Sequence, residues 1–169
     1  MQLKKDAQVF LSVMESNKGI IYKVANAYCK NDENRKDLIQ EILVQLWLSF
    51  GKYDKQYSIS TWMYRIALNV AISFYRKENS RNKINQPLPV DTLFLREEGN
   101  GLQKEADLQH LQQFIKELKE IDRAIIILYL EEKPQQEIAT ILGLSTTNIA
   151  TRVLRIKQQL KQKFSTIKN

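Results

Sequence analysis

The stretch LGLSTTNIATRVLRIKQQLKQK, residues 142–163, begins with neutral hydroxyl and amide side chains and ends in cations. No Asp or Glu follows Glu137. The cations in the same part of the chain are Arg152, Arg155, Lys157, Lys161, Lys163 and Lys168. The whole chain is also basic, because 26 Lys and Arg against 19 Asp and Glu give a net charge of +7. This order indicates an anionic partner, and a solvated basic tail is the alternative.

The segment around this stretch has the pattern of a helix, a sharp turn and a second helix. Pro134 can begin the first helix but could not continue one. Gly143 permits the positive backbone angle that ends this helix, and Ser145 can cap the next one. The small Ala139 lets two helices cross closely. The predicted inward-facing residues are Ile138, Ala139 and Leu142 in the first helix and Ile149, Val153, Ile156 and Leu160 in the second.

The opposite face of the second helix carries short polar side chains followed by arginines. In a helix-turn-helix, the first residues of the second helix enter the major groove, where hydroxyl and amide groups reach base edges and thymine methyls. Arginines one turn later can reach phosphates or a guanine edge. We therefore predict duplex DNA binding through Thr146, Thr147, Asn148, Ala150, Thr151, Arg152 and Arg155.

Outward from this motif, apolar residues recur at helical spacing almost everywhere and strand alternation is scarce. The predicted stripes are Ile20, Val24 and Tyr28; then Leu38, Ile42, Leu46 and Phe50; then Trp62, Ile66, Val70 and Phe74 after a Ser60 cap. Periodicity fades over residues 80–103, which hold two prolines and two glycines. We predict an all-α protein with two small helical domains, at residues 1–79 and 104–169, joined by a flexible linker at residues 80–103. Such a tether predicts a monomer with mobile domains.

Several classes of function are disfavoured by residues that the chain lacks. Cys29 and His110 are the only residues of their types, which excludes an intrachain disulfide and a Cys/His metal site, and no triad accompanies His110. Gly99 and Gly101 follow no strand and precede no phosphate-loop lysine. The chain also lacks a signal peptide and a run of about 18 apolar residues. We expect a cytoplasmic protein without membrane insertion, metal, cofactor or enzymatic activity.

Two earlier segments carry polar faces beside their apolar stripes. DLIQEILVQLW, residues 37–47, presents Asp37, Gln40, Glu41 and Gln45, a face that could simply be solvated. STWMYRIALNVAISFYRK, residues 60–77, interleaves aromatic residues with cations and amides. That mixture suits unpaired bases, which offer faces for stacking and edges for hydrogen bonds. The opposing observation is that Trp62 and Phe74 lie on the predicted core face.

Taken together, the segments resemble the extracytoplasmic-function sigma factors, the small two-domain specificity subunits of bacterial RNA polymerase. DLIQEILVQLW resembles the core-binding helix of their region 2, and STWMYRIALNVAISFYRK is similar to their melting and minus-ten segment. EIATILGLSTTNIATRVLRIKQQLK, residues 137–161, resembles region 4, which binds the minus-thirty-five element. The resemblance covers nearly the whole chain.

The resemblance implies a sigma factor that directs RNA polymerase to specific promoters and initiates promoter melting. Its implied partners are promoter DNA, the clamp helices of the largest polymerase subunit, the flap region of the second-largest subunit, and an anti-sigma factor. The residues implied in contact with the clamp helices are Asp37, Gln40, Glu41 and Gln45. Asn69 would read a flipped minus-ten base, with Ser73 a turn away and Arg76 and Lys77 near the backbone. The loop GKYDKQYSI, residues 51–59, would wrap the extruded base.

Two residues depart from the family pattern. Ser73 stands where members often carry Asp or a basic residue, and Ala150 stands where a basic residue is common. Thr151, Arg152 and Arg155 would then carry more of the duplex contact. One alternative is a stand-alone helix-turn-helix repressor or activator whose first domain dimerises or senses a ligand. Another is a helical RNA-processing or nucleotidyl enzyme, which the absence of paired acids at metal-binding spacing disfavours.

Overall fold

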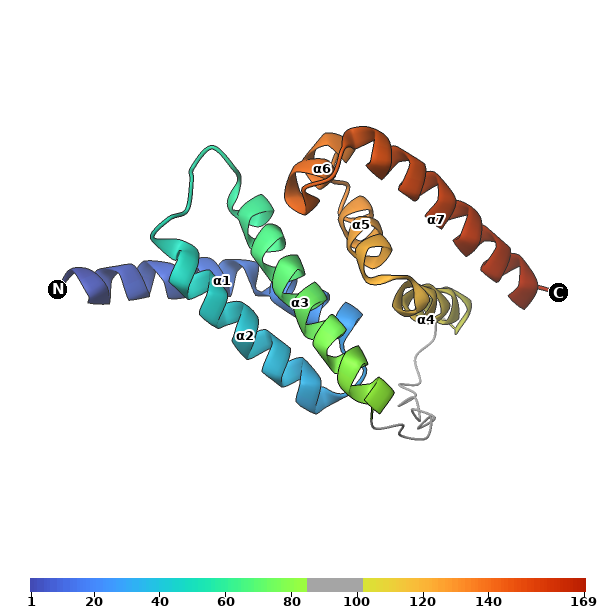
Figure 1. Cartoon of the computed structure of the whole chain (residues 1–169), viewed down its shortest axis with the longest axis horizontal. Coiled ribbons are helices and arrows are strands. Elements are labelled where there is room, and N and C mark those ends of the chain that lie inside the picture. Colours follow the sequence, from blue (N-terminus) through green and yellow to red (C-terminus); the bar gives the residue numbers. More distant parts are fainter. Residues whose placement is uncertain (85–101) are drawn as a thin grey trace.

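The computed structural model describes residues 1–84 and 102–169, and all regular structure within these ranges is helical (Figure 1). The first lobe holds α1 (Gln2–Tyr28), α2 (Asp32–Phe50) and α3 (Ile59–Ile84). The second lobe holds α4 (Leu102–Glu117), α5 (Glu120–Leu130), α6 (Gln135–Leu142) and α7 (Thr146–Ile167). The prediction of an all-α chain with two helical domains is confirmed. None of the helices in the two described ranges is long and apolar enough to cross a membrane.

In the first lobe, α1, α2 and α3 pack against one another around a shared apolar core. Asn31 caps α2 by accepting a hydrogen bond from the Asn34 backbone N–H at 2.8 Å. The α2 stripe of Leu38, Ile42 and Leu46 is fully buried, as its four-residue spacing predicts. This packing leaves the opposite face of α2 in solvent.

The helix α3 is buried on a different side from the one predicted. Trp62 and Phe74, with the rest of their stripe, are only half-buried, whereas Tyr64 and Leu68 are among the most buried residues of the chain. The reason is that α3 contacts α1 and α2 on one side and α5 and α6 on the other. The cap also differs, because the hydroxyl of Ser58 rather than that of Ser60 accepts from the Thr61 N–H, at 3.2 Å.

The second lobe is built around α5, whose residues Asp122 through Leu128 are all buried. α4, α6 and α7 contact this helix, and α6 and α7 cross as the two arms of the helix-turn-helix. Ile149, Val153 and Ile156 supply the buried stripe of α7, as predicted. Their spacing fixes which side of α7 faces the lobe and which side remains exposed.

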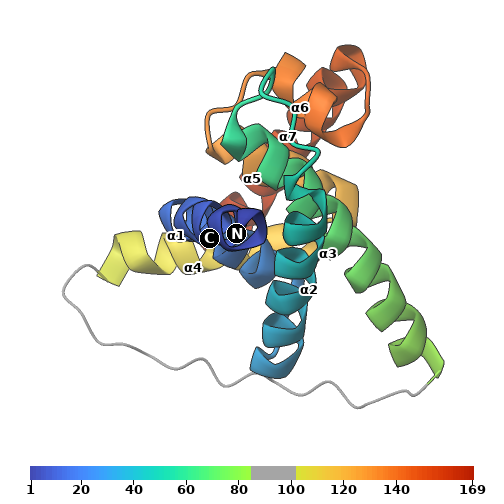
Figure 2. The same ribbon diagram turned by 90° about the vertical axis from the view of Figure 1, so that its left-hand side faces the viewer.

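The two lobes are packed together, which differs from the prediction of mobile domains (Figure 2). At the centre of the contact, Arg123 of α5 is 2% exposed and its guanidinium lies 5.0 Å from the Tyr28 ring centroid and 4.7 Å from that of Tyr75. Its Nη1 donates to the Ala27 carbonyl at 3.0 Å. A cation stacked on two rings and hydrogen-bonded to the backbone is a directional contact that no sequence periodicity reveals.

A second part of the interlobe contact is polar and joins the start of α3 to α6 and to the turn that precedes α6. Lys133 donates to the Ser60 hydroxyl at 2.8 Å, and Thr61 donates to the Glu137 carboxylate. Nearer the Arg123 contact, Arg76 of α3 forms an ion pair with Glu120 of α5 at 3.0 Å. The closed arrangement therefore occupies Arg76, which the sequence analysis placed near the backbone of promoter DNA.

The predicted linker at residues 80–103 falls mainly outside the described residues. Within the described part, α3 continues to Ile84, five residues past the predicted domain end at Asn79, and α4 already begins at Leu102. An ion pair between Glu78 and Arg81, three residues apart on α3, supports the helix where the apolar periodicity has ended.

Candidate nucleic-acid interface

The turn between α6 and α7 has the geometry that its sequence predicts. Gly143 adopts the left-handed conformation with φ 68°, which favours glycine because it has no side chain to clash. Ser145 then caps α7 by accepting from the Asn148 N–H at 3.1 Å. The first turn of α7 consequently starts at a fixed point, with its polar residues directed away from the buried stripe.

The structure brings most of the predicted duplex-binding residues together on one face of α7. A shallow depression is lined by Ser145, Thr147, Asn148, Thr151, Arg152 and Arg155. Thr146 and Ala150 are exposed but do not line it. Ser145 lines this depression in addition to capping α7, and the capping pattern alone does not indicate this second role. A concave surface of hydroxyl, amide and guanidinium groups can read base edges and phosphates.

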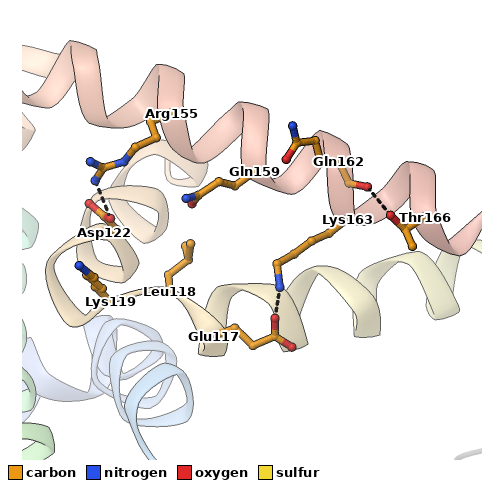
Figure 3. Close-up of a pocket in the computed structure, with 9 residues that line it drawn as sticks. All are labelled: Glu117, Leu118, Lys119, Asp122, Arg155, Gln159, Gln162, Lys163 and Thr166. Carbon is orange, nitrogen blue, oxygen red and sulfur yellow. Dashed lines mark hydrogen bonds and ion pairs between the residues drawn. The ribbon is translucent and has the colours of Figure 1, made fainter.

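The two arginines of this face are held by one buried carboxylate from α5. The Asp122 side chain is 6% exposed, and its Oδ1 accepts from Arg152 Nη1 at 2.7 Å while its Oδ2 accepts from Arg155 Nη2 at 2.8 Å. Figure 3 shows Arg155 reaching from α7 toward Asp122, at one end of a groove that Gln159 and Lys163 also line. Arg152 donates further to Asn148 Oδ1 at 2.7 Å.

The four predicted minus-ten residues are all exposed on α3. Asn69, Ser73, Arg76 and Lys77 recur at intervals of four, three and one residues, which places them on one side of a helix. Arg76 alone among them forms a described contact with the second lobe, through Glu120. The amide and hydroxyl groups of Asn69 and Ser73 are therefore accessible to an unstacked base even with the lobes packed.

The aromatic residues near this face are less available than their spacing suggests. Tyr64 is buried, and Tyr75 packs against Tyr28 with a centroid separation of 6.0 Å. Trp62 packs against Tyr53 of the preceding loop at 5.2 Å. These contacts assign the aromatic side chains to the packing of the lobe. The loop at residues 51–58 remains at the surface, with Tyr57 exposed.

The polar face of α2 is exposed and has an apolar centre that the sequence analysis missed. Asp37, Gln40, Glu41 and Gln45 are all in solvent. Val44 and Leu48, which are 53% and 64% exposed, lie on the same side of the helix, with Val44 among the polar residues and Leu48 one turn beyond it. Apolar residues ringed by polar ones are typical of a protein interface. The four-residue spacing of Val44 and Leu48, off the buried stripe, is the signal that identifies them.

Two electrostatic features accompany the interlobe contact. The Glu120 carboxyl has its pKa held below the usual range, first by a hydrogen bond from its own backbone and then by Arg76. Lys116 has its pKa lowered by burial and by the neighbouring cations Arg35, Arg123 and Lys30. Positive charge is thus concentrated where α2, α4, α5 and the turn between α1 and α2 meet.

Comparison with known proteins matches both lobes. The family model for sigma-70 region 2 matches residues 13–81, and the model for sigma-70 region 4 matches residues 108–160. The ECF RNA polymerase sigma factor SigX of Bacillus subtilis is 31% identical over 73% of this chain and 68% of its own length. The ECF sigma factor SigW of the same organism is 26% identical over 96% of this chain and 93% of its own length.

A solved structure agrees with the arrangement of the helices. The sigma factor RpoE of Bartonella quintana, crystallised in complex with the anti-sigma factor NepR, has a TM-score of 0.73 to this chain. The match covers 96% of this chain and 98% of that one at 20% identity, so it supports the fold.

The fold and the exposed faces define a two-lobed helical protein with a helix-turn-helix in its second lobe. With both sigma regions matched in order, the chain belongs to the extracytoplasmic-function group of the sigma-70 family. It is a sigma factor that directs RNA polymerase to promoters. The alternative of a stand-alone repressor or activator is not favoured, because region 2 is matched as well as the helix-turn-helix.

Proposed function

We propose that the two lobes read the two elements of a promoter in different states of the DNA. The exposed face of α7 reads the upstream minus-thirty-five element as duplex, and the exposed face of α3 captures an unstacked minus-ten base. One observation carries the proposal. The same chain has a helix-turn-helix whose polar residues line one depression on α7, and it also has the exposed residues Asn69 and Ser73 on α3. Melting is driven by binding energy, since unstacking a base costs a few kcal/mol that pocket and phosphate contacts offset.

The α2 face is the proposed contact with the clamp helices of the largest polymerase subunit. Asp37, Gln40, Glu41 and Gln45 form its rim, and Val44 and Leu48 form its apolar centre. This arrangement supports a core-binding role because exposed apolar side chains gain free energy when a partner covers them. The second lobe contacts the flap region of the second-largest subunit in this proposal.

The packed arrangement must open before both promoter elements can be bound. The two elements lie about 25 base pairs apart, which is roughly 85 Å of duplex. Asn69 lies about 12 Å along α3 from Thr61, and Thr61 is hydrogen-bonded to Glu137. Thr147 can be no more than about 35 Å from Glu137 along the chain. With the side chains that join Thr61 to Glu137 included, Asn69 and Thr147 are thus at most roughly 60 Å apart while the lobes remain packed.

The remaining parts of the proposal follow from family membership. The units are residues 1–79 for region 2, 80–103 for a linker and 104–169 for region 4, and the protein acts in the cytoplasm. It performs no chemistry of its own, because its contribution is binding and positioning. An anti-sigma factor is proposed as a further partner, supported by the fold shared with a sigma factor crystallised with such an inhibitor.

Substitution of Asn69 tests the base-capture role. Asn69→Ala removes the amide proposed to pair with an extruded base, so open-complex formation on duplex promoters should fall roughly tenfold while upstream duplex binding stays nearly unchanged. Permanganate footprinting of unpaired thymines with the assembled polymerase measures the melted state. A premelted bubble should restore part of the melting but not the preference at the captured base.

A matched control is Asn26→Ala, which removes an amide that is also exposed, from α1, without altering the α3 face. This variant should melt promoters like the parent chain. Normal melting and an unchanged base preference in Asn69→Ala would remove the base-capture role, and the chain would then resemble an ordinary duplex binder.

A further inference from the structure

The carboxylate of Asp122 lies between the two arginines of the α7 face and belongs to none of the predicted DNA contacts. Its side chain is 6% exposed, and each oxygen accepts from a different arginine, at 2.7 and 2.8 Å. A carboxylate this buried is retained only with good partners, because an uncompensated buried charge is strongly destabilising. Asp122 and the arginines are therefore tied to one another.

The same contacts divide the work of the two arginines. Arg152 uses Nη1 for Asp122 and Nε for Asn148, and its side chain is 30% exposed. Arg155 has one described contact, through Nη2 to Asp122, and is 51% exposed. The Nε and Nη1 groups of Arg155 have no partner among the described residues, so this guanidinium still has donors to offer a phosphate or guanine edge.

Asn148 is the residue through which this arrangement reaches the bases. Its Oδ1 accepts from Arg152, and its amide NH2 has no partner within residues 1–84 and 102–169. Because Arg152 already holds the amide oxygen of Asn148, this side chain has less rotamer freedom to lose when it binds DNA, and the entropic cost of binding is lower. Two hydrogen bonds thus connect the interior of the lobe to its reading face, one from Arg152 to Asp122 and one from Arg152 to Asn148.

We propose that Asp122 is a positioning residue for promoter recognition, which fixes Asn148 through Arg152 and holds Arg155 at the edge of the reading face. The proposal rests on the proposed function, in which α7 reads duplex DNA. Arg152 then acts as a bracket within the protein and makes no phosphate contact. Asp122 lowers the general attraction of this face for DNA, since it neutralises part of the charge of two arginines, and in return increases its sequence selectivity.

The test uses Asp122→Asn in the full chain assembled with core RNA polymerase. Asn keeps the size of the side chain and one acceptor oxygen but removes the charge. The probes are a duplex library with a randomised upstream window and a scrambled duplex of equal length. The variant should bind scrambled duplex more tightly, with a salt slope steeper by about one to two units as arginines are released toward phosphates. Its selectivity for the preferred upstream sequence should fall about tenfold.

Opposite changes in selectivity and in general affinity separate a positioning role from a merely structural one. A folding defect would weaken binding to both probes in proportion to the inactive fraction, which a titration against core polymerase and a thermal midpoint measure. Glu117→Gln is the matched control, because it removes an equal charge from an ion pair with Lys163 at the other end of the groove in Figure 3. This control should leave selectivity unchanged.

Arg152→Ala provides a second variant that does not depend on burying a neutral side chain at position 122. If Arg152 only positions Asn148, Arg152→Ala should lose selectivity for the upstream sequence while the salt slope of binding stays unchanged. The double variant Arg152→Ala with Asp122→Asn should be no less selective than either single variant. A slope lowered by about one unit in Arg152→Ala would show a direct phosphate contact and overturn the assignment. Unchanged selectivity and slope in Asp122→Asn would overturn it as well. If the parent polymerase selects no upstream sequence, the duplex-reading function of α7 fails instead.

Discussion

At the scale of single residues, the reading face of α7 depends on where the turn before it ends. Gly143 at φ 68° reverses the chain, and the Ser145 cap starts the next helix two residues later. Both features can be predicted from the sequence because they are local, involving a residue and its neighbours up to three positions away. The contact between Asp122 and Arg152 cannot, since it joins residues thirty positions apart and changes no periodicity.

Gly143→Ala should destabilise the fold by about 1 kcal/mol, because an L-residue in the left-handed region is strained even where space is available. Apart from its two chain neighbours, a Cβ at this position would meet no heavy atom within 4 Å, so the cost is one of backbone conformation alone. Gly51→Ala is the control, with φ −66° and equally open surroundings, and should be neutral or stabilising by up to about 1 kcal/mol. Urea unfolding measures both, and equal effects of the two substitutions would contradict the explanation.

At the scale of helices, burial follows the predicted stripes where a helix has one packed side and departs from them where it has two. Leu38, Ile42 and Leu46 of α2 are buried as predicted. The α3 prediction is shifted because its burial also depends on the second lobe, which covers the side near Thr61 and Tyr75. The exposed centre of α2, in contrast, is visible in the sequence as Val44 and Leu48 lying off the stripe.

Substitution of this centre tests the core-binding role of α2. Val44→Ser with Leu48→Ser should weaken binding to core polymerase by roughly tenfold or more, since central apolar contacts contribute most of the free energy of an interface. Gln40→Ala with Glu41→Ala, at the rim, should have a smaller effect. Both double variants should keep the parent unfolding midpoint, because all four side chains are exposed. Undiminished co-purification of the Val44 and Leu48 variant with polymerase would contradict the assignment.

At the scale of the whole molecule, the two lobes are closed around Arg123 and Glu120, and the proposed function requires them to separate on the promoter. The tether predicted mobile domains from composition, but composition cannot report a cation held between the rings of Tyr28 and Tyr75. The ordering of sigma regions along the chain was predictable because each region carries its own local pattern. Their packing was not, because it depends on contacts between residues far apart in the sequence.

Fluorescence energy transfer between the lobes measures the opening. Dyes at Lys36→Cys on α2 and Lys161→Cys on α7 should give efficient transfer in the free chain and much less in the promoter complex with polymerase. Cys29 should remain unlabelled at neutral pH, because it is buried and burial raises the pKa of its thiol to about 11. A pair within the first lobe, Lys4→Cys with Lys36→Cys, is the control. Transfer between the lobes that stays high in the promoter complex would contradict the opening.

The most direct test of the central claim is transcription reconstituted from purified bacterial core polymerase, the full chain and genomic fragments. We predict that the chain confers initiation at defined start sites, each preceded by shared minus-ten and minus-thirty-five sequences, and that core polymerase alone gives none. Asn69→Ala should reduce these transcripts, and a premelted minus-ten region should partly restore them. If the chain adds no specific initiation and instead binds a palindromic duplex as a dimer without polymerase, the account of this protein as a promoter-directing sigma factor is wrong.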